Sequence, residues 1–256
     1  MIICEEKWQH IPLLHIVADE LIDKDIPVVV FFHGFTSAKE HNLHYAYNLA
    51  NQGMRVLLPE AHLHGVRSEG LDEVEMGLRF WEIVLTNLEE LKILYKTLQE
   101  KGLLKKAKIG VGGTSMGGIT TLGALKVYDW IDVASVMMGA PNYVELAKAQ
   151  IQQFESKGFE IPVSYEERQK LFEQLAYFDL TKHRDALKGR PVYFWHGKND
   201  VVVPYKPTFK FFKELQEDYK SYPEKLSFMT DQTAGHAVSR KGMLTAVDWF
   251  ASHLKE

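Results

Sequence analysis

The chain has 256 residues, of which 46% are apolar and 25% are charged, a composition typical of globular domains and unlike that of disordered or fibrous chains. Its 30 basic and 34 acidic residues give a net charge of −4, so no concentration of positive charge indicates nucleic acid or an anionic membrane as a partner. The length suits one α/β domain spanning residues 1–256.

The start of the chain and its apolar runs bear on location. Residues 1–8 lack the basic start, apolar centre and small-residue cleavage site of a secretory signal. Apolar runs such as residues 26–32 are far shorter than the ~20 residues that cross a bilayer. The single cysteine, Cys4, forms no internal disulfide and fits a reducing compartment. We therefore expect a cytoplasmic protein that does not enter a membrane.

The order of apolar segments predicts the fold class. Ile2–Trp8 and Ile11–Val17 are expected to form an antiparallel pair of strands. The β-branched and aromatic run at residues 27–32 is typical of a strand buried on both faces of a sheet. Later strands are expected at residues 56–58, 109–111, 133–138, 192–195 and 226–229. Because helical segments separate them, we predict an α/β fold with a mostly parallel central sheet and helices on both faces.

Two helical regions stand out. Residues 73–101 carry apolar residues at helical spacing and are followed by Gly102, which predicts one long packing helix. Between the strands ending at 138 and starting at 192, the chain is much longer than one crossover helix requires. We interpret residues 143–184 as a helical cap inserted into the domain, made of two or three short helices.

The strongest local motif is Gly-Thr-Ser-Met-Gly-Gly at residues 113–118, between a predicted strand and a predicted helix at residues 119–127. This is the strand, sharp turn and helix context of the G-x-S-x-G nucleophile elbow. Ser115 is the candidate nucleophile, and the backbone N–H of Met116 is a candidate oxyanion donor at the helix N-terminus. A serine at a helix start flanked by packing glycines is the structural alternative.

A second motif, Phe-Phe-His-Gly-Phe-Thr at residues 31–36, ends the first long strand. Ligands of open α/β sheets bind beyond the carboxyl ends of the strands. We expect the backbone N–H of Phe35 to be the second oxyanion donor, with Gly34 allowing close approach. His33 is interpreted mainly as a turn histidine that hydrogen-bonds within the loop.

Two further loops follow predicted strands. Asp200, in Trp-His-Gly-Lys-Asn-Asp at residues 195–200, is the candidate acid that orients an imidazole. His236, in Thr-Ala-Gly-His-Ala at residues 233–237 and before a predicted helix at residues 243–254, is the candidate base. A solvated turn aspartate and a surface histidine are the alternatives. The order Ser115, Asp200, His236 is the one that α/β-hydrolases use.

With these motifs, the chain resembles the α/β-hydrolase superfamily over nearly its full length, and in particular small bacterial carboxylesterases of the YjfP type, near the dienelactone hydrolase and prolyl oligopeptidase branches. The resemblance implies a serine carboxylesterase that hydrolyses short-chain acyl esters through an acyl-enzyme, with no cofactor and no metal. Dienelactone hydrolases have cysteine as the nucleophile, whereas this sequence has Ser115, which argues against lactone ring opening of that type.

Several alternatives remain open at this level. A thioesterase or a carbohydrate deacetylase would use the same triad, and a non-catalytic ligand-binding homologue would keep the same fold. The histidines at 41, 44, 62 and 64 could be considered as metal ligands, but no zinc motif is present. We expect a small-molecule ester as partner, and an exposed apolar surface of the cap allows a homodimer. Aromatic residues of the cap are candidates for an acyl or alcohol pocket: Tyr143, Phe154, Phe159, Tyr165, Phe172, Tyr177 and Phe178.

Overall fold

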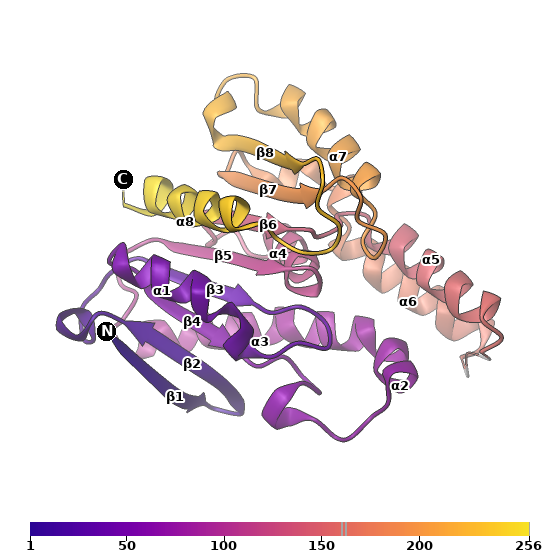
Figure 1. The fold of residues 1–256 in the computed structure, drawn as a ribbon, viewed down its shortest axis with the longest axis horizontal. Helices are drawn as coiled ribbons and strands as arrows, with labels where there is room; N and C mark the ends of the chain where they lie inside the picture. The colour runs from indigo at the N-terminus through magenta and orange to yellow at the C-terminus, as the bar shows by residue number, and fades with distance from the viewer. Residues whose placement is uncertain (160, 162, 256) are drawn as a thin grey trace.

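The computed structural model describes residues 1–159, 161 and 163–255. In this part of the chain, the sheet has eight strands in the order β1-β2-β4-β3-β5-β6-β7-β8 (Figure 1). The strands are β1 (Ile2–Trp8), β2 (Ile11–Val17), β3 (Val28–Phe32), β4 (Arg55–Pro59), β5 (Ile109–Thr114), β6 (Val133–Met137), β7 (Val192–Gly197) and β8 (Leu226–Asp231). β1 and β2 pair antiparallel, β2 also runs antiparallel to β4, and the other pairs are parallel. The predicted mostly parallel sheet is confirmed.

Helices cover both faces of the sheet. The α-helices are α1 (Leu43–Asn51), α2 (Glu73–Leu78), α3 (Phe80–Glu100), α4 (Met116–Val127), α5 (Tyr143–Ser156), α6 (Tyr165–Phe178), α7 (Tyr205–Asp218) and α8 (Arg240–Leu254). α1 and α8 pack on one face of the sheet, whereas α3, α4 and α7 pack on the other (Figure 1). Strands buried from both sides explain the nearly continuous apolar runs in the sequence. None of the helices in the described residues combines the length and apolar character that crossing a bilayer requires.

The long helix predicted over residues 73–101 is wrong in one respect, because the structure breaks it at Arg79 into α2 and α3. Arg79 has φ −95° and ψ 9°, outside regular helix geometry. α2 has its own capping box from Asp72 and Glu75. At Gly77 the ring of Phe154 from α5 packs so closely that a Cβ would lie 2.6 Å from it. The apolar spacing continues across the break, so the sequence pattern did not reveal it.

Residues 143–184 contain two 14-residue helices, α5 and α6, followed by the short 3-10 helices η4 (Leu180–Lys182) and η5 (Arg184–Leu187). α5 and α6 lie side by side at one end of the molecule, beyond the arrowheads of the parallel strands (Figure 1). Their apolar faces join a cluster with α2, α3 and the start of α4. The insertion therefore lies at the carboxyl ends of the parallel strands, where the predicted site residues are also found.

Candidate active site

Ser115 occupies the sharp turn between β5 and α4. Its backbone has φ 55° and ψ −113°, a conformation that is strained for a side chain other than glycine. The flanking glycines are required by crowding: a Cβ at Gly117 would lie 2.2 Å from the Phe32 carbonyl oxygen, and one at Gly113 would lie 2.5 Å from the Gly117 carbonyl carbon. The packed neighbours hold the strain, and they present the serine hydroxyl at the end of the sheet.

The structure brings the three sequence-predicted polar residues together. His236 Nε2 lies 2.8 Å from Ser115 Oγ, and His236 Nδ1 lies 2.7 Å from Asp200 Oδ2. Asp200 follows β7 and His236 follows β8. Because these strands are parallel neighbours, the carboxylate and the imidazole lie at the same end of the sheet. The loops are also joined by their backbones, since Asn199 N–H donates to the Ala234 carbonyl at 3.0 Å.

The Asp200 carboxylate accepts several hydrogen bonds. The N–H groups of Val202 and Val203 both donate to Oδ1 at 2.9 Å, while His236 and His196 approach Oδ2. Burial alone would raise the pKa of Asp200, but the contacts with His196 and His236 outweigh it and hold the pKa well below the usual range. Asp200 is therefore ionised, and it favours the tautomer in which His236 carries its proton on Nδ1 and accepts from Ser115 on Nε2.

His196 is a site residue that the sequence reasoning quoted within a motif but gave no role. It is fully buried at the end of β7, and its Nε2 lies 2.8 Å from the Val203 carbonyl oxygen and 3.3 Å from Asp200 Oδ2. The His196 Nε2–H therefore contacts both Asp200 and Val203, which belong to the loop that follows β7. Its position in the Trp-His-Gly block before Asp200 was the only signal in the sequence, and that signal did not specify the contact.

The two candidate oxyanion donors come from segments next to the nucleophile. Met116 is the first residue of α4, where helix N–H groups have no partner within the helix. The loop that carries Phe35 passes directly beside Ser115, because a Cβ at Gly34 would lie 3.6 Å from the Ser115 Cβ. Among the described residues, neither the Phe35 N–H nor the Met116 N–H donates to a protein acceptor. Both donors are free to bind a ligand oxygen.

Two buried histidines support this loop. His33 Nδ1 donates to the Gly34 carbonyl at 2.8 Å, and His33 Nε2 accepts from Ala61 N–H at 3.0 Å. His64 Nε2 accepts from Thr36 N–H at 3.0 Å. From the sequence, His64 is considered only as a metal ligand, and this contact is not predicted.

The histidines at 41, 44, 62 and 64 are used separately. His41 contacts the Ser37 hydroxyl, the His44 ring packs on Tyr45, and the His62 ring faces Glu82. Within the described part of the chain, no group of three or more histidine, cysteine, aspartate or glutamate side chains is placed to hold a metal ion. The structure thus gives each of these side chains a different neighbour.

The aromatic residues of the insertion differ in burial, and Phe154, Phe172 and Phe178 are partly buried. Tyr143 is fully buried, and its hydroxyl donates to the Ile119 carbonyl in α4. Tyr165 and Tyr177 are 71% and 57% exposed. Tyr143 is therefore a packing residue, and the exposed tyrosines point toward solvent.

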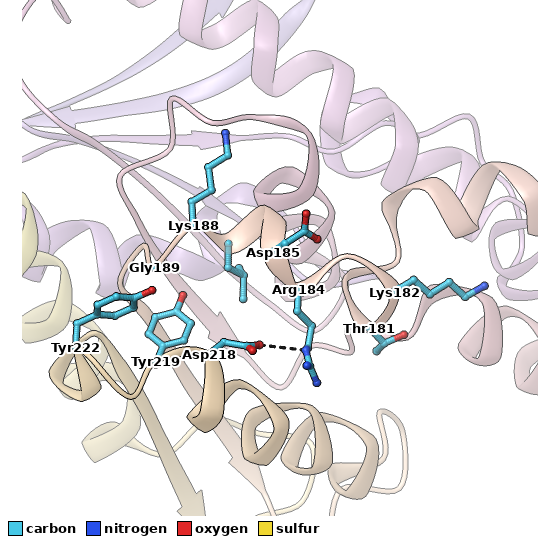
Figure 2. A pocket seen from close by; sticks show the side chains of 10 residues that line it. Thr181, Lys182, Arg184, Asp185, Lys188, Gly189, Asp218, Tyr219 and Tyr222 are labelled. Atoms are coloured by element: carbon cyan, nitrogen blue, oxygen red, sulfur yellow. Dashed lines mark ion pairs between the residues drawn. The ribbon is translucent and has the colours of Figure 1, made fainter.

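A cavity of about 580 Å³ lies near the amino-terminal end of β7, and Figure 2 shows the side chains that line it. Its lining comes from the residues before β7 and from the end of α7, whereas Asp200 follows β7. The six residues of β7 place roughly 20 Å between these two ends of the strand. Arg184 in the cavity is already paired with Asp218 at 3.1 Å. This cavity is separate from the serine, histidine and aspartate cluster.

Comparison with known proteins agrees with this architecture. Residues 86–256 match the prolyl oligopeptidase family. The chain is 48% identical to YitV of Bacillus subtilis (strain 168) and 30% identical to the esterase YjfP of Escherichia coli (strain K12), in each case over 244 residues that cover 95% of this chain and 96% of the relative. The structure of TT1662 from Thermus thermophilus shares the fold, with a TM-score of 0.77, 19% identity and full coverage of both chains. The resemblance seen in the motifs is confirmed, the fold is that of the α/β-hydrolases, and the chain belongs to the prolyl oligopeptidase family.

Proposed function

We propose that this protein is a serine carboxylesterase that hydrolyses short-chain acyl esters, with Ser115 as nucleophile, His236 as base and Asp200 as the orienting acid. The observation that carries the proposal is the continuous chain of hydrogen bonds from Ser115 Oγ through the imidazole to the ionised carboxylate, at 2.8 and 2.7 Å. Both relatives named above carry the word esterase in their names, which supports ester substrates.

The proposed reaction has two acyl-transfer steps. His236 Nε2 takes the proton of Ser115 as Oγ attacks the ester carbonyl, and the N–H groups of Phe35 and Met116 bind the oxyanion of the tetrahedral intermediate. The C–O bond to the alcohol then breaks, and the imidazolium protonates the leaving alkoxide. Water attacks the acyl-enzyme with His236 again as base, which releases the acid and restores the serine hydroxyl.

The packing beside the oxyanion loop supports small acyl groups. The Phe35 ring packs edge-on against Phe80, with ring centroids 5.4 Å apart, so aromatic carbon fills the space next to the proposed donor. We therefore propose short acyl groups, because ring carbon beside the donor leaves less room for a long acyl chain.

The first test compares the protein with Ser115→Ala and with a control, Ser252→Ala, at an exposed position on α8. Each is incubated with a fluorophosphonate probe and with p-nitrophenyl acetate, butyrate and octanoate. We expect labelling at Ser115, fastest hydrolysis of the two short esters, and a loss of turnover by about 10³-fold or more in Ser115→Ala alone. Hydrolysis that survives in Ser115→Ala would refute the assignment, and a preference for thioesters or acetylated sugars in parallel assays would redirect the substrate class.

A further inference from the structure

His64 is held in a defined tautomer beside the oxyanion loop. It lies after β4, only 3% exposed, where its Nδ1 donates to the His62 carbonyl at 2.8 Å and its Nε2 accepts from Thr36 N–H at 3.0 Å. Because Nε2 is an acceptor, the ring must be neutral, and burial lowers the pKa of His64, which favours that neutral form. One buried side chain thus joins two loops that are 28 residues apart in sequence.

The bond to Thr36 fixes the backbone that carries the proposed oxyanion donor. Phe35 lies between two peptide planes. The plane before it contains the Gly34 carbonyl and the Phe35 N–H itself, and His33 holds that carbonyl at 2.8 Å. The plane after it contains the Thr36 N–H, which His64 holds. Thr36 also has φ +57°, a conformation that needs support in a residue with a branched side chain.

The rings add contact to these hydrogen bonds. The His64 ring packs edge-on against Phe35, with centroids 5.6 Å apart, and against His33 at 5.1 Å. Phe35 is therefore limited on its backbone and on its side chain by the same residue. A variant without His64 would still have the Phe35 N–H, but the peptide that carries it could rotate away from Ser115.

The segment that carries His64 is itself anchored. Glu60 is fully buried and accepts from the Lys39 backbone N–H and from Lys39 Nζ, each at 3.1 Å. Arg67 donates to the Glu60 carbonyl at 2.9 Å and to the Glu90 carboxylate. With both sides of the loop anchored, a displacement of His64 requires breaking several buried interactions, so the segment is suited to hold a donor within the narrow tolerance that transition-state binding needs.

We propose that His64 is a positioning residue of the oxyanion hole, which holds the Phe35 N–H toward the developing oxyanion by accepting a hydrogen bond from Thr36. The inference rests on the proposed esterase function. It differs from that proposal in assigning a role to a residue that touches neither substrate nor nucleophile.

The test uses steady-state kinetics on p-nitrophenyl acetate with the full chain. His64→Leu and His64→Met remove the acceptor, His64→Gln keeps an acceptor oxygen at the position of Nε2, and His62→Leu changes a histidine of the same loop whose ring faces Glu82 instead. An oxyanion donor acts mainly in the transition state, so we expect kcat to fall about 10- to 100-fold in the Leu and Met variants, with KM changed less than two-fold. His64→Gln should stay within about five-fold of the parent kcat, and His62→Leu within about two-fold.

Thermal unfolding of each variant separates loss of fold from loss of alignment. An undiminished kcat in a folded Leu or Met variant would overturn the inference, as would a folded His64→Gln that loses as much kcat as they do. If neither non-accepting variant folds, His64→Gln decides alone, because the inference requires it to remain active. Failure of the proposed function looks different: the unmodified protein would then neither hydrolyse the ester nor label at Ser115.

Discussion

The loops at the carboxyl ends of the strands and the α5–α6 hairpin meet at the same edge of the sheet, but they are built differently. In the loops, polar side chains are buried and each has several hydrogen-bond partners. Four donors approach Asp200, and Glu60 accepts from the backbone N–H and the Nζ of Lys39. The hairpin meets the core mainly through apolar side chains and leaves Tyr165 and Tyr177 exposed.

The loops and the hairpin therefore have different roles, since the loops fix the positions of polar atoms and the hairpin provides apolar packing. Buried polar networks fix atoms to within a few tenths of an ångström, because a misplaced partner leaves an unsatisfied group in a low-dielectric environment. Apolar contacts tolerate shape changes much better. We therefore expect substitutions in the strand-end loops to affect turnover or pH-dependent stability, and substitutions in the hairpin to affect packing alone.

The largest effect is expected for Asp200→Asn. The amide would donate to His236 Nδ1, which forces the proton onto Nε2 and prevents that nitrogen from accepting the Ser115 proton. We expect kcat on p-nitrophenyl acetate to fall by about 10³- to 10⁴-fold at pH 7. Steady-state assays, with thermal unfolding to verify the fold, provide the measurement.

Asp129→Asn serves as the matched control. The Asp129 side chain is 78% exposed, and its ion pair with Lys188 is a long one of 3.9 Å at the surface. Its kcat should equal that of the parent. Retention of more than a tenth of the activity in a folded Asp200→Asn variant would show that the carboxylate does not set the tautomer of His236.

A smaller effect is expected from the pH dependence of Glu60. Burial alone would raise the pKa of this carboxyl, but the hydrogen bonds from the Lys39 ammonium and backbone N–H lower it from 4.5 to about 2. A group with a lowered folded-state pKa stabilises the protein above its unfolded pKa, and this contribution is lost as the pH falls from about 5 toward 2. The linkage relation gives a loss of roughly 1 kcal/mol between pH 6 and pH 3.5.

Urea unfolding of the parent and of Glu60→Gln at pH 6 and pH 3.5 isolates this contribution. The variant leaves Lys39 without its buried partner and should be less stable at pH 6. The gap between the two proteins should narrow by about 1 kcal/mol at pH 3.5, because Glu60 of the parent takes up a proton in the unfolded chain while it stays ionised in the folded protein. A gap that is constant with pH would mean that Glu60 is not preferentially ionised in the folded protein.

The sequence predicted the residues of the candidate site whose positions depend on local pattern. Ser115, Asp200 and His236 each follow a strand whose apolar run is visible, and parallel strands necessarily bring such residues to one edge. The contacts of His64 and His196 were beyond its reach, because each depends on how two loops meet in space. The break at Arg79 was also missed, since apolar spacing continues from α2 into α3.

The smallest effect concerns the hairpin, through Tyr143→Phe. The Tyr143 hydroxyl donates to the Ile119 carbonyl, which joins α5 to the helix that follows the nucleophile. Loss of this one buried hydrogen bond, with the ring retained, should cost about 1 kcal/mol and lower Tm by roughly 2–4 °C. Tyr165→Phe, at an exposed position of the same insertion, should leave Tm unchanged. Because the hairpin supplies packing and no reacting group, kcat on p-nitrophenyl acetate should stay within two-fold in both variants. A ten-fold loss of kcat in Tyr143→Phe would instead show that α5 helps to align the nucleophile. The hairpin could then no longer be regarded as a packing element alone.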